Sequence, residues 1–149
     1  MALYEAGLAE SGLDVGAQRQ LREQAALWRF VHVAESQAQA EDELAAALHQ
    51  GRHHSVHARA THNPPDFHVE AGRVNPWNDP KVSHEDGVRY SLQASTLYGT
   101  PQRVAEQVAE LHDAGVRHVL CQISYGYLPH RTIIDSMRRF GEAVAPKFR

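Results

Sequence analysis

Two short apolar runs, each followed directly by a helix-forming segment, restrict most strongly what this chain can fold into. The runs cover residues 27–33 (LWRFVHV) and 117–123 (RHVLCQI), and both consist mainly of apolar residues. Such runs are typical of strands buried on both faces of a parallel sheet. A strand followed by a helix, repeated twice, predicts an α/β fold. Two strands alone leave both sheet edges open, so the sequence predicts one part of a larger parallel sheet or barrel.

Helix signals follow each of these runs. Ser36 is a suitable N-cap for a helix over residues 37–50, because its hydroxyl can accept from the first turn. Thr100 and Pro101 mark the start of another helix, since proline lacks an N–H that the first turn leaves unbonded anyway. Two more helices are predicted, over residues 2–11 and from 130 to Pro146, the last with an apolar face of Ile133, Met137, Phe140 and Val144.

The stretch between these halves, residues 51–94, is predicted to be a long connecting excursion with weak periodicity. It is either a lid over the site or a surface or interface arm. Pairs of its histidines have the i, i+4 spacing that suits Zn²⁺, but no Cys pair and no HExxH glutamate accompanies them, so no metal is predicted. Six of the eleven histidines fall within twenty residues of this part of the chain: His49, His53, His54, His57, His62 and His68.

Length and composition exclude several classes of protein. The 149 residues, 42% hydrophobic and 22% charged, predict one globular domain over 1–149, short of the ~250 residues of a complete (β/α)8 barrel. Fifteen Lys+Arg against eighteen Asp+Glu form no basic stripe, so nucleic-acid binding is not predicted. The absence of a membrane-length apolar run and of a visible secretory signal predicts no membrane association and a cytoplasmic location. The single cysteine, Cys121, lies in an apolar run and is predicted to be buried.

The block GTPQRVAEQVAELHDAGVRHVLCQISYGYLPHRTIIDSMRRFGEAVAPKF, residues 99–148, resembles the C-terminal end of bacterial-luciferase-like flavin-dependent monooxygenases. The segment WRFVHVAESQAQAEDEL, residues 28–44, resembles the preceding strand and helix of the same family. The resemblance covers roughly residues 26–50 and 95–148. It implies the C-terminal portion of a luciferase-like (β/α)8 TIM barrel, incomplete by itself, whose last two strands are the two apolar runs.

The same resemblance implies a cofactor and partners. The cofactor would be reduced FMN, or alternatively a deazaflavin, because the two groups of enzymes share these C-terminal features. A flavin reductase would supply the reduced FMN. The missing N-terminal barrel part or a partner subunit would complete the barrel, in a homo- or hetero-oligomer.

The polar residues that follow the second apolar run are the candidate site. In barrels of this type, ligands bind at the C-terminal ends of the strands. Amide and hydroxyl groups there can hydrogen-bond a flavin ring, so Gln122, Ser124, Tyr125 and Gly126 are predicted to bind the cofactor. Alternatively, the tyrosine closes the barrel or faces a neighbouring chain. No catalytic residue is assigned, because no GxSxG, GxGxxG or P-loop string occurs.

Three functions remain open at this point. The first is part of a luciferase-like flavin-dependent monooxygenase that uses reduced flavin and O2 on a small organic substrate. The second is a non-catalytic subunit that completes a barrel or dimerises through its exposed strand edges. The third is a deazaflavin-dependent oxidoreductase. The native mass and the visible absorbance of the assembly would separate the enzymes from the interaction protein.

Overall fold

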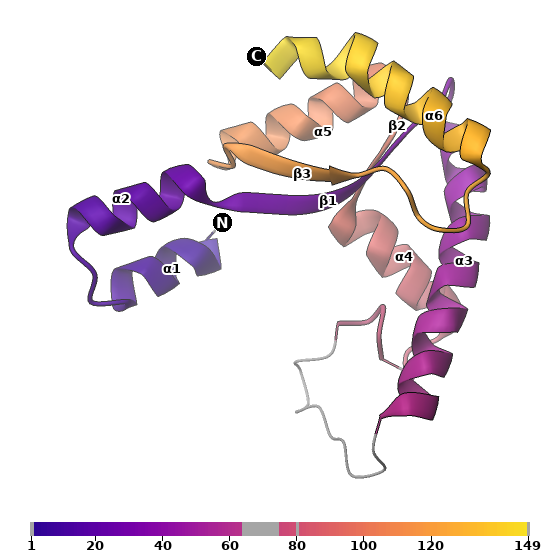
Figure 1. Ribbon diagram of the computed structural model, residues 1–149, viewed down its shortest axis with the longest axis horizontal. Helices are drawn as coiled ribbons and strands as arrows, with labels where there is room; N and C mark the ends of the chain where they lie inside the picture. The colour runs from indigo at the N-terminus through magenta and orange to yellow at the C-terminus, as the bar shows by residue number, and fades with distance from the viewer. Residues whose placement is uncertain (1, 64–74, 80, 149) are drawn as a thin grey trace.

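Three parallel strands form one sheet at the centre of the protein. The computed structural model describes residues 2–63, 75–79 and 81–148. The strands β1 (Ala26–Val33), β2 (Thr96–Gly99) and β3 (His118–Gln122) lie in the order β2-β1-β3 (Figure 1). Phe30 pairs with the first residue of β2 and with the last residue of β3. The sheet is therefore staggered, with β2 beside the second half of β1 and β3 beside the first half.

The two predicted strands are confirmed as parallel neighbours, since Ala26–Phe30 of β1 pair with His118–Gln122. The third strand, β2, was not predicted. Its sequence, TLYG, has four residues and follows α4 directly, without a turn signal between them. An apolar run this short cannot be told from the end of a helix by periodicity.

Helices make up most of the rest of the described chain, and the predicted caps are confirmed. The Ser36 side chain accepts from the Gln39 N–H, and the Thr100 side chain accepts from the Arg103 N–H. The helices are α1 (Ala2–Glu10), α2 (Val15–Gln24), α3 (Gln37–His62), α4 (His84–Ser95), α5 (Pro101–Asp113) and α6 (His130–Arg139), followed by a π turn (Phe140–Val144) and a 3-10 turn (Ala145–Phe148).

The predicted excursion over residues 51–94 contains more helix than its sequence indicates. α3 continues past residue 50 to His62, and α4 begins at His84. The prolines that weaken the pattern come after the end of α3, so they do not interrupt it. Residues 64–74 and residue 80 of the excursion, with His68 among them, lie outside the described residues.

The helices cover both faces of the sheet. α5 and α6 lie on one face and α3 and α4 on the other (Figure 1). Crossovers between parallel strands are right-handed in nearly all proteins, so connections that run in opposite directions along a sheet lie on opposite faces. The connection from β1 to β2 and the connection from β2 past β1 to β3 run in opposite directions. The strand order therefore dictates the two helical layers.

This arrangement differs from that of a (β/α)8 barrel. In such a barrel each strand lies beside its neighbours in sequence, and the helices cover the outer face alone. Here β1 lies between β2 and β3, and both faces are covered. The chain has an α/β fold with a small parallel sheet, in an order typical of open, doubly wound sheets.

The prediction that the second apolar run is buried is wrong. In β3 four of the five residues are exposed and Val119 is half-buried. Cys121 is likewise exposed, not buried. The reason is the stagger, because β3 pairs with the first half of β1, beyond the part of the sheet that β2 and its flanking helices occupy. Hydrophobicity predicts burial only where the rest of the fold supplies a cover.

The apolar face predicted for the last helix is confirmed in part. Val144 is buried and Phe140 packs against the same cluster, but Met137 is 49% exposed. The α-helix ends at Arg139 and widens into the π turn, which shifts the angular phase of the residues that follow. None of the helices in the described ranges is long and apolar enough to cross a membrane.

The first two helices form an arm, α1 and α2 (residues 2–24), that projects from one end of the sheet (Figure 1). α1 buries Leu8, and α2 buries no residue. Arg22 pairs with Glu5 at 2.7 Å and holds the two helices together. His118 Nε2, at the start of β3, lies 2.9 Å from the Glu23 carbonyl oxygen and links the arm to the sheet.

Candidate functional site

The predicted site residues follow one another at the carboxyl end of β3. Gln122, the last residue of the strand, uses both ends of its side-chain amide within the chain. Its Oε1 accepts from Trp28 Nε1 at 3.1 Å, and its Nε2 donates to the Ser124 carbonyl oxygen at 3.0 Å. This amide ties β1 to the turn after β3. It helps to position the turn, and each end of the amide retains one further hydrogen-bonding capacity.

Tyr125 packs inward. Its ring stacks on Phe30 with 4.5 Å between centroids and belongs to the apolar cluster beneath α3 and α4. Its hydroxyl is buried beside the Thr96 side chain without a hydrogen bond of good geometry, and burial raises the pKa of the phenol well above its usual range. A buried O–H without a partner costs free energy, so this atom is a candidate contact for a water molecule or a ligand group.

Gln122, Ser124 and Gly126 are the exposed members of the predicted set, and neither Ser124 nor Gly126 ties β1 to the turn as Gln122 does. Gly126 has φ +78°, a left-handed conformation that glycine adopts without strain, and no atom lies within 4 Å of the place where a Cβ would stand. The turn therefore exposes the backbone at Gly126 close to the exposed Ser124. The structure brings the four predicted residues together in different settings: Gln122 and Tyr125 contact β1, Tyr125 packs inward, and Gln122, Ser124 and Gly126 are exposed.

His32, on β1, is a polar residue of this region that the sequence analysis did not single out. It is 1% exposed, and its Nε2 lies 2.7 Å from Oε2 of Glu43 on α3. Because a carboxylate only accepts, Nε2 carries the proton and Nδ1 is left as an acceptor, which has no partner. Burial lowers the pKa of His32 despite the opposing effect of Glu43, so the neutral form is favoured.

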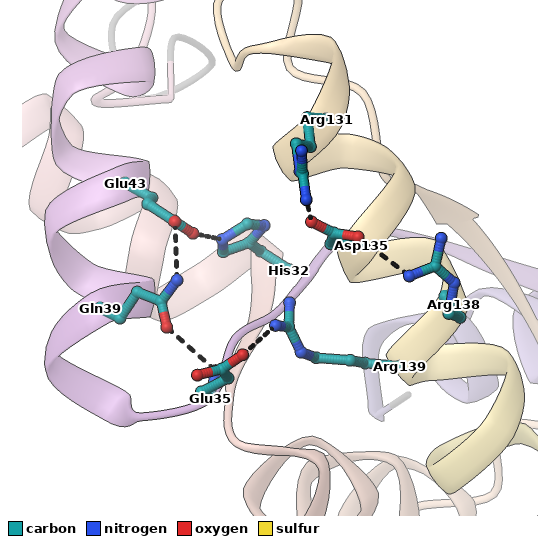
Figure 2. A network of polar contacts seen from close by, with 8 residues as sticks. All are labelled: His32, Glu35, Gln39, Glu43, Arg131, Asp135, Arg138 and Arg139. Atoms are coloured by element: carbon teal, nitrogen blue, oxygen red, sulfur yellow. Dashed lines mark hydrogen bonds and ion pairs between the residues drawn. The ribbon is translucent and has the colours of Figure 1, made fainter.

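A chain of polar contacts runs from His32 across the carboxyl end of β1 to α6 (Figure 2). Gln39 Nε2 donates to Glu43 Oε1 at 2.9 Å, and its Oε1 accepts from the Glu35 N–H at 3.2 Å. The Glu35 carboxylate then accepts from Arg139 of α6 at 2.6 Å. Arg131 and Arg138 both pair with Asp135 on α6 itself, so Arg139 is the arginine of this group that reaches across to β1.

One signal in the sequence pointed toward this chain of contacts. The segment 34–36 follows β1 and lies at the end of a strand, where parallel sheets bind ligands. Since β1 leads to α3 on one face and β3 leads to α6 on the other, the space between the ends of β1 and β3 is the topological switch point of this sheet. His32 itself gave no such signal, because a lone histidine in an apolar strand does not reveal its partner.

The described part of the histidine-rich segment lies on α3, where His53, His54, His57 and His62 are exposed and His49 packs against α4. His84 Nε2 lies 2.9 Å from the His49 carbonyl oxygen, and the two rings are 4.8 Å apart. Arg52, within the stretch predicted to be a lid or a surface or interface arm, is 3% exposed. Across the described ranges, no group of three or more potential metal ligands comes together. The Arg52 guanidinium donates to three backbone carbonyl oxygens, those of Pro76, Asp79 and Val82.

Comparison with known protein families identifies the chain. The family model described as luciferase-like monooxygenase matches residues 1–118. The chain belongs to this family. The match runs from the arm through β1, β2 and α5 to the first residue of β3. No curated protein matches the chain.

The match to luciferase-like monooxygenases confirms the family that the resemblance named, and it overlaps the resemblance at residues 26–50 and 95–118. Residues 119–148, which contain the candidate site residues, lie beyond the matched range. The matched part contains His32, Glu35 and Glu43, which belong to the polar contacts at the end of β1. The two halves of the switch point thus come from the family-matched region and from the segment that follows it.

The chemistry available to this luciferase-like chain is mainly hydrogen bonding. Ser124 offers a hydroxyl at the surface, while the buried Tyr125 hydroxyl and His32 Nδ1 offer a donor and an acceptor without partners. A groove of about 280 Å³ lies elsewhere, along β2 between α4 and α5, and Arg29, Arg103 and Glu110 are among its lining residues. The residues described around the switch point are therefore a candidate site, at a point where the fold type places ligands.

Proposed function

We propose that this chain is part of a luciferase-like monooxygenase that uses reduced FMN and O2 to oxidise a small organic substrate. The family match over residues 1–118 carries the proposal. A cytoplasmic flavin reductase would supply the reduced FMN. A deazaflavin is the alternative cofactor, and direct comparison of the two in binding measurements separates these possibilities.

The residues at the switch point fit one edge of a flavin and not a whole enclosing pocket. Ser124 is exposed, and the open backbone around Gly126 allows close approach of a planar ring. When bound, reduced flavin supplies the electrons that activate O2, whereas the protein binds and orients it. In this proposal Ser124 hydrogen-bonds the cofactor, Gly126 permits its approach, and Gln122 and Tyr125 hold the turn in place.

The remaining walls of the site would come from residues beyond this sequence. Three strands cannot close a barrel, and the outer edge of β3 carries no strand among the described residues. We propose that the missing N-terminal barrel part or a partner subunit contributes the other strands. In a closed barrel β2 and β3 would have to become neighbours, so assembly would rearrange the order β2-β1-β3.

Flavin binding by the full chain and by the native complex isolated from its host tests the proposal. We expect FMN fluorescence to be quenched on binding, and Ser124→Ala to weaken binding about fivefold, the effect of losing one hydrogen bond worth about 1 kcal/mol. Ser95→Ala is the matched control, because Ser95 precedes β2 at the opposite end of the sheet. Absence of both flavin and deazaflavin binding in chain and complex alike would refute the proposal and favour the non-catalytic subunit.

A further inference from the structure

The groove at the amino end of β2 is a separate feature from the candidate site at the carboxyl ends of the strands. It has a volume of about 280 Å³, and Arg29 of β1 is among its lining residues. Arg29 lies two residues before Val31, so its side chain is on the face of the sheet that α5 covers. β2 begins opposite Phe30, and the preceding residues of β1 therefore have no β2 residue beside them. The groove lies next to this gap.

Arg29 is a cation of the groove without an acidic partner in the described part of the protein. Its Nη1 donates to the Trp28 carbonyl oxygen at 2.8 Å, which leaves the other N–H groups of the guanidinium free. Burial lowers the pKa of Arg29 from its ordinary value, and no neighbouring charge opposes this effect. A charge that is partly removed from water without a counter-ion costs free energy. A bound anion would recover this cost.

The second arginine of the groove has its charge balanced within α5. Arg103 Nη1 lies 3.4 Å from the carboxylate of Glu106 and 3.4 Å from that of Glu110. Glu110 also lines the groove and would repel an anion. The attraction for an anion therefore comes mainly from Arg29, and the position of the anion is restricted to its side of the groove.

Amide donors and apolar side chains complete the lining. Gln107 Oε1 accepts from the Tyr98 N–H at 2.9 Å, whereas its Nε2 has no acceptor among the described residues. The Gln93 side chain is exposed beside the groove. Leu97 and Leu111 contribute apolar atoms. A cation, amide donors and a small apolar wall are the groups that recognise a carboxylate with a short apolar end.

We propose that this groove binds a small organic carboxylate, whose oxygens accept from Arg29 and Gln107 and whose apolar end contacts Leu97 and Leu111. A planar guanidinium matches the two oxygens of a carboxylate. The volume of about 280 Å³ restricts the ligand to a small molecule. The outer edge of β3 and the carboxyl ends of the strands stay free for the missing strands and the flavin.

This site has a consequence for assembly that rests on the proposed function. Closing the barrel would move β2 from its place beside β1, and the groove exists only in the order β2-β1-β3. A ligand shifts an equilibrium toward the arrangement that binds it better. A carboxylate in the groove therefore favours the unassembled chain.

An NMR titration of the 15N-labelled full chain with sodium butyrate, without flavin, tests the site. We expect a dissociation constant of about 1 mM, reasonable for so small a ligand, with shifts at Thr96 and Leu97. Arg29→Gln keeps much of the volume but removes the charge, so binding should weaken about tenfold or more. Arg131→Gln is the matched control, because it removes the same charge from α6, where Arg131 is 94% exposed, and binding should not change. Glu110→Gln removes the repulsion and should tighten binding about twofold.

Two other probes separate the parts of this recognition. Butyramide has the same apolar end without the charge and should bind about tenfold more weakly than butyrate. Inorganic phosphate lacks the apolar end and should also bind more weakly. Phosphate that binds as tightly as butyrate would overturn the organic part of the proposal.

The variants decide whether the site exists. No butyrate binding by the native chain, or equal binding by native chain and Arg29→Gln, overturns it. Circular dichroism verifies that Arg29→Gln folds. Should it not fold, Arg29→Lys replaces it, and this variant should bind butyrate about threefold more weakly, because lysine lacks the planar fork. The titration contains no flavin, so its failure is distinguishable from a failure of the proposed function.

Discussion

The two faces of the sheet are packed with different kinds of side chain. Beneath α5 and α6 the sheet presents Val31, Val33 and Leu97, which pack against aliphatic side chains. Beneath α3 and α4 it presents His32 and is covered by tyrosine and leucine side chains. In the described part of the chain, the buried polar side-chain atoms that lack a partner all belong to this second layer: His32 Nδ1, Arg52 Nε and the Tyr125 hydroxyl.

This difference suggests separate roles for the two faces: the aliphatic face stabilises the fold, and the polar face is the candidate for function. The aliphatic face gains free energy from burial without any polar cost. The polar face contains unpaired donors and acceptors, each of which costs about 1–3 kcal/mol when buried. Proteins keep such groups chiefly where a ligand, a water molecule or a specific geometry uses them. The polar face is therefore the side on which to look for function.

The aliphatic face should be the more sensitive to loss of packing. Leu97→Ala removes a side chain that is 6% exposed, and we expect a loss of about 3 kcal/mol in the free energy of unfolding because a cavity remains. Urea unfolding measures this loss. Leu120→Ala removes the same atoms from a site that is 58% exposed, and its stability as a monomer should change by no more than about 0.5 kcal/mol. Equal losses would show that the aliphatic face is not the main core.

On the polar face, Arg52 should matter most. Arg52→Met keeps much of the buried volume but removes the donors to the carbonyl oxygens of Pro76, Asp79 and Val82. We expect a loss of about 2 kcal/mol, because buried acceptors without partners are costly. Arg59→Met, an exposed change on the same helix, is the control. If Arg52→Met were as stable as the native protein, its carbonyl contacts would not hold the segment before α4.

A smaller effect should come from His32 and should depend on pH. Burial lowers the pKa of His32 from its ordinary value of 6.5, so the unfolded chain binds this proton more readily than the folded one. The stability that the neutral His32 contributes is complete above pH 6.5 and is lost as the pH falls below it. We therefore expect the free energy of unfolding of His32→Gln to decline less on acidification than that of the native protein. His57→Gln, at an exposed position, serves as the control for the loss of a histidine. Parallel profiles for His32→Gln and the native chain would contradict this role.

Local rules predicted the elements whose signals lie within a few residues. Such rules predicted the caps at Ser36 and Thr100 and the strand at 27–33. Capping and strand burial both depend on residues that are close together in the sequence. The candidate residues in the turn after β3 follow from the rule for strand ends, and their role stays a prediction. β2 was missed, since four residues carry too little pattern, and the partners of His32 were missed because Glu43 lies on another element.

The sequence by itself determined that this chain builds a parallel α/β sheet with capped helices, and it contained enough of the family's pattern to name luciferase-like monooxygenases. Only the tertiary structure decided that β1 lies in the middle, that β3 is an exposed edge and that Tyr125 turns inward. The physical reason is that hydrophobicity and capping depend on neighbours along the chain. Strand order and burial depend on which distant segments pack together, and one sequence pattern is compatible with several such arrangements.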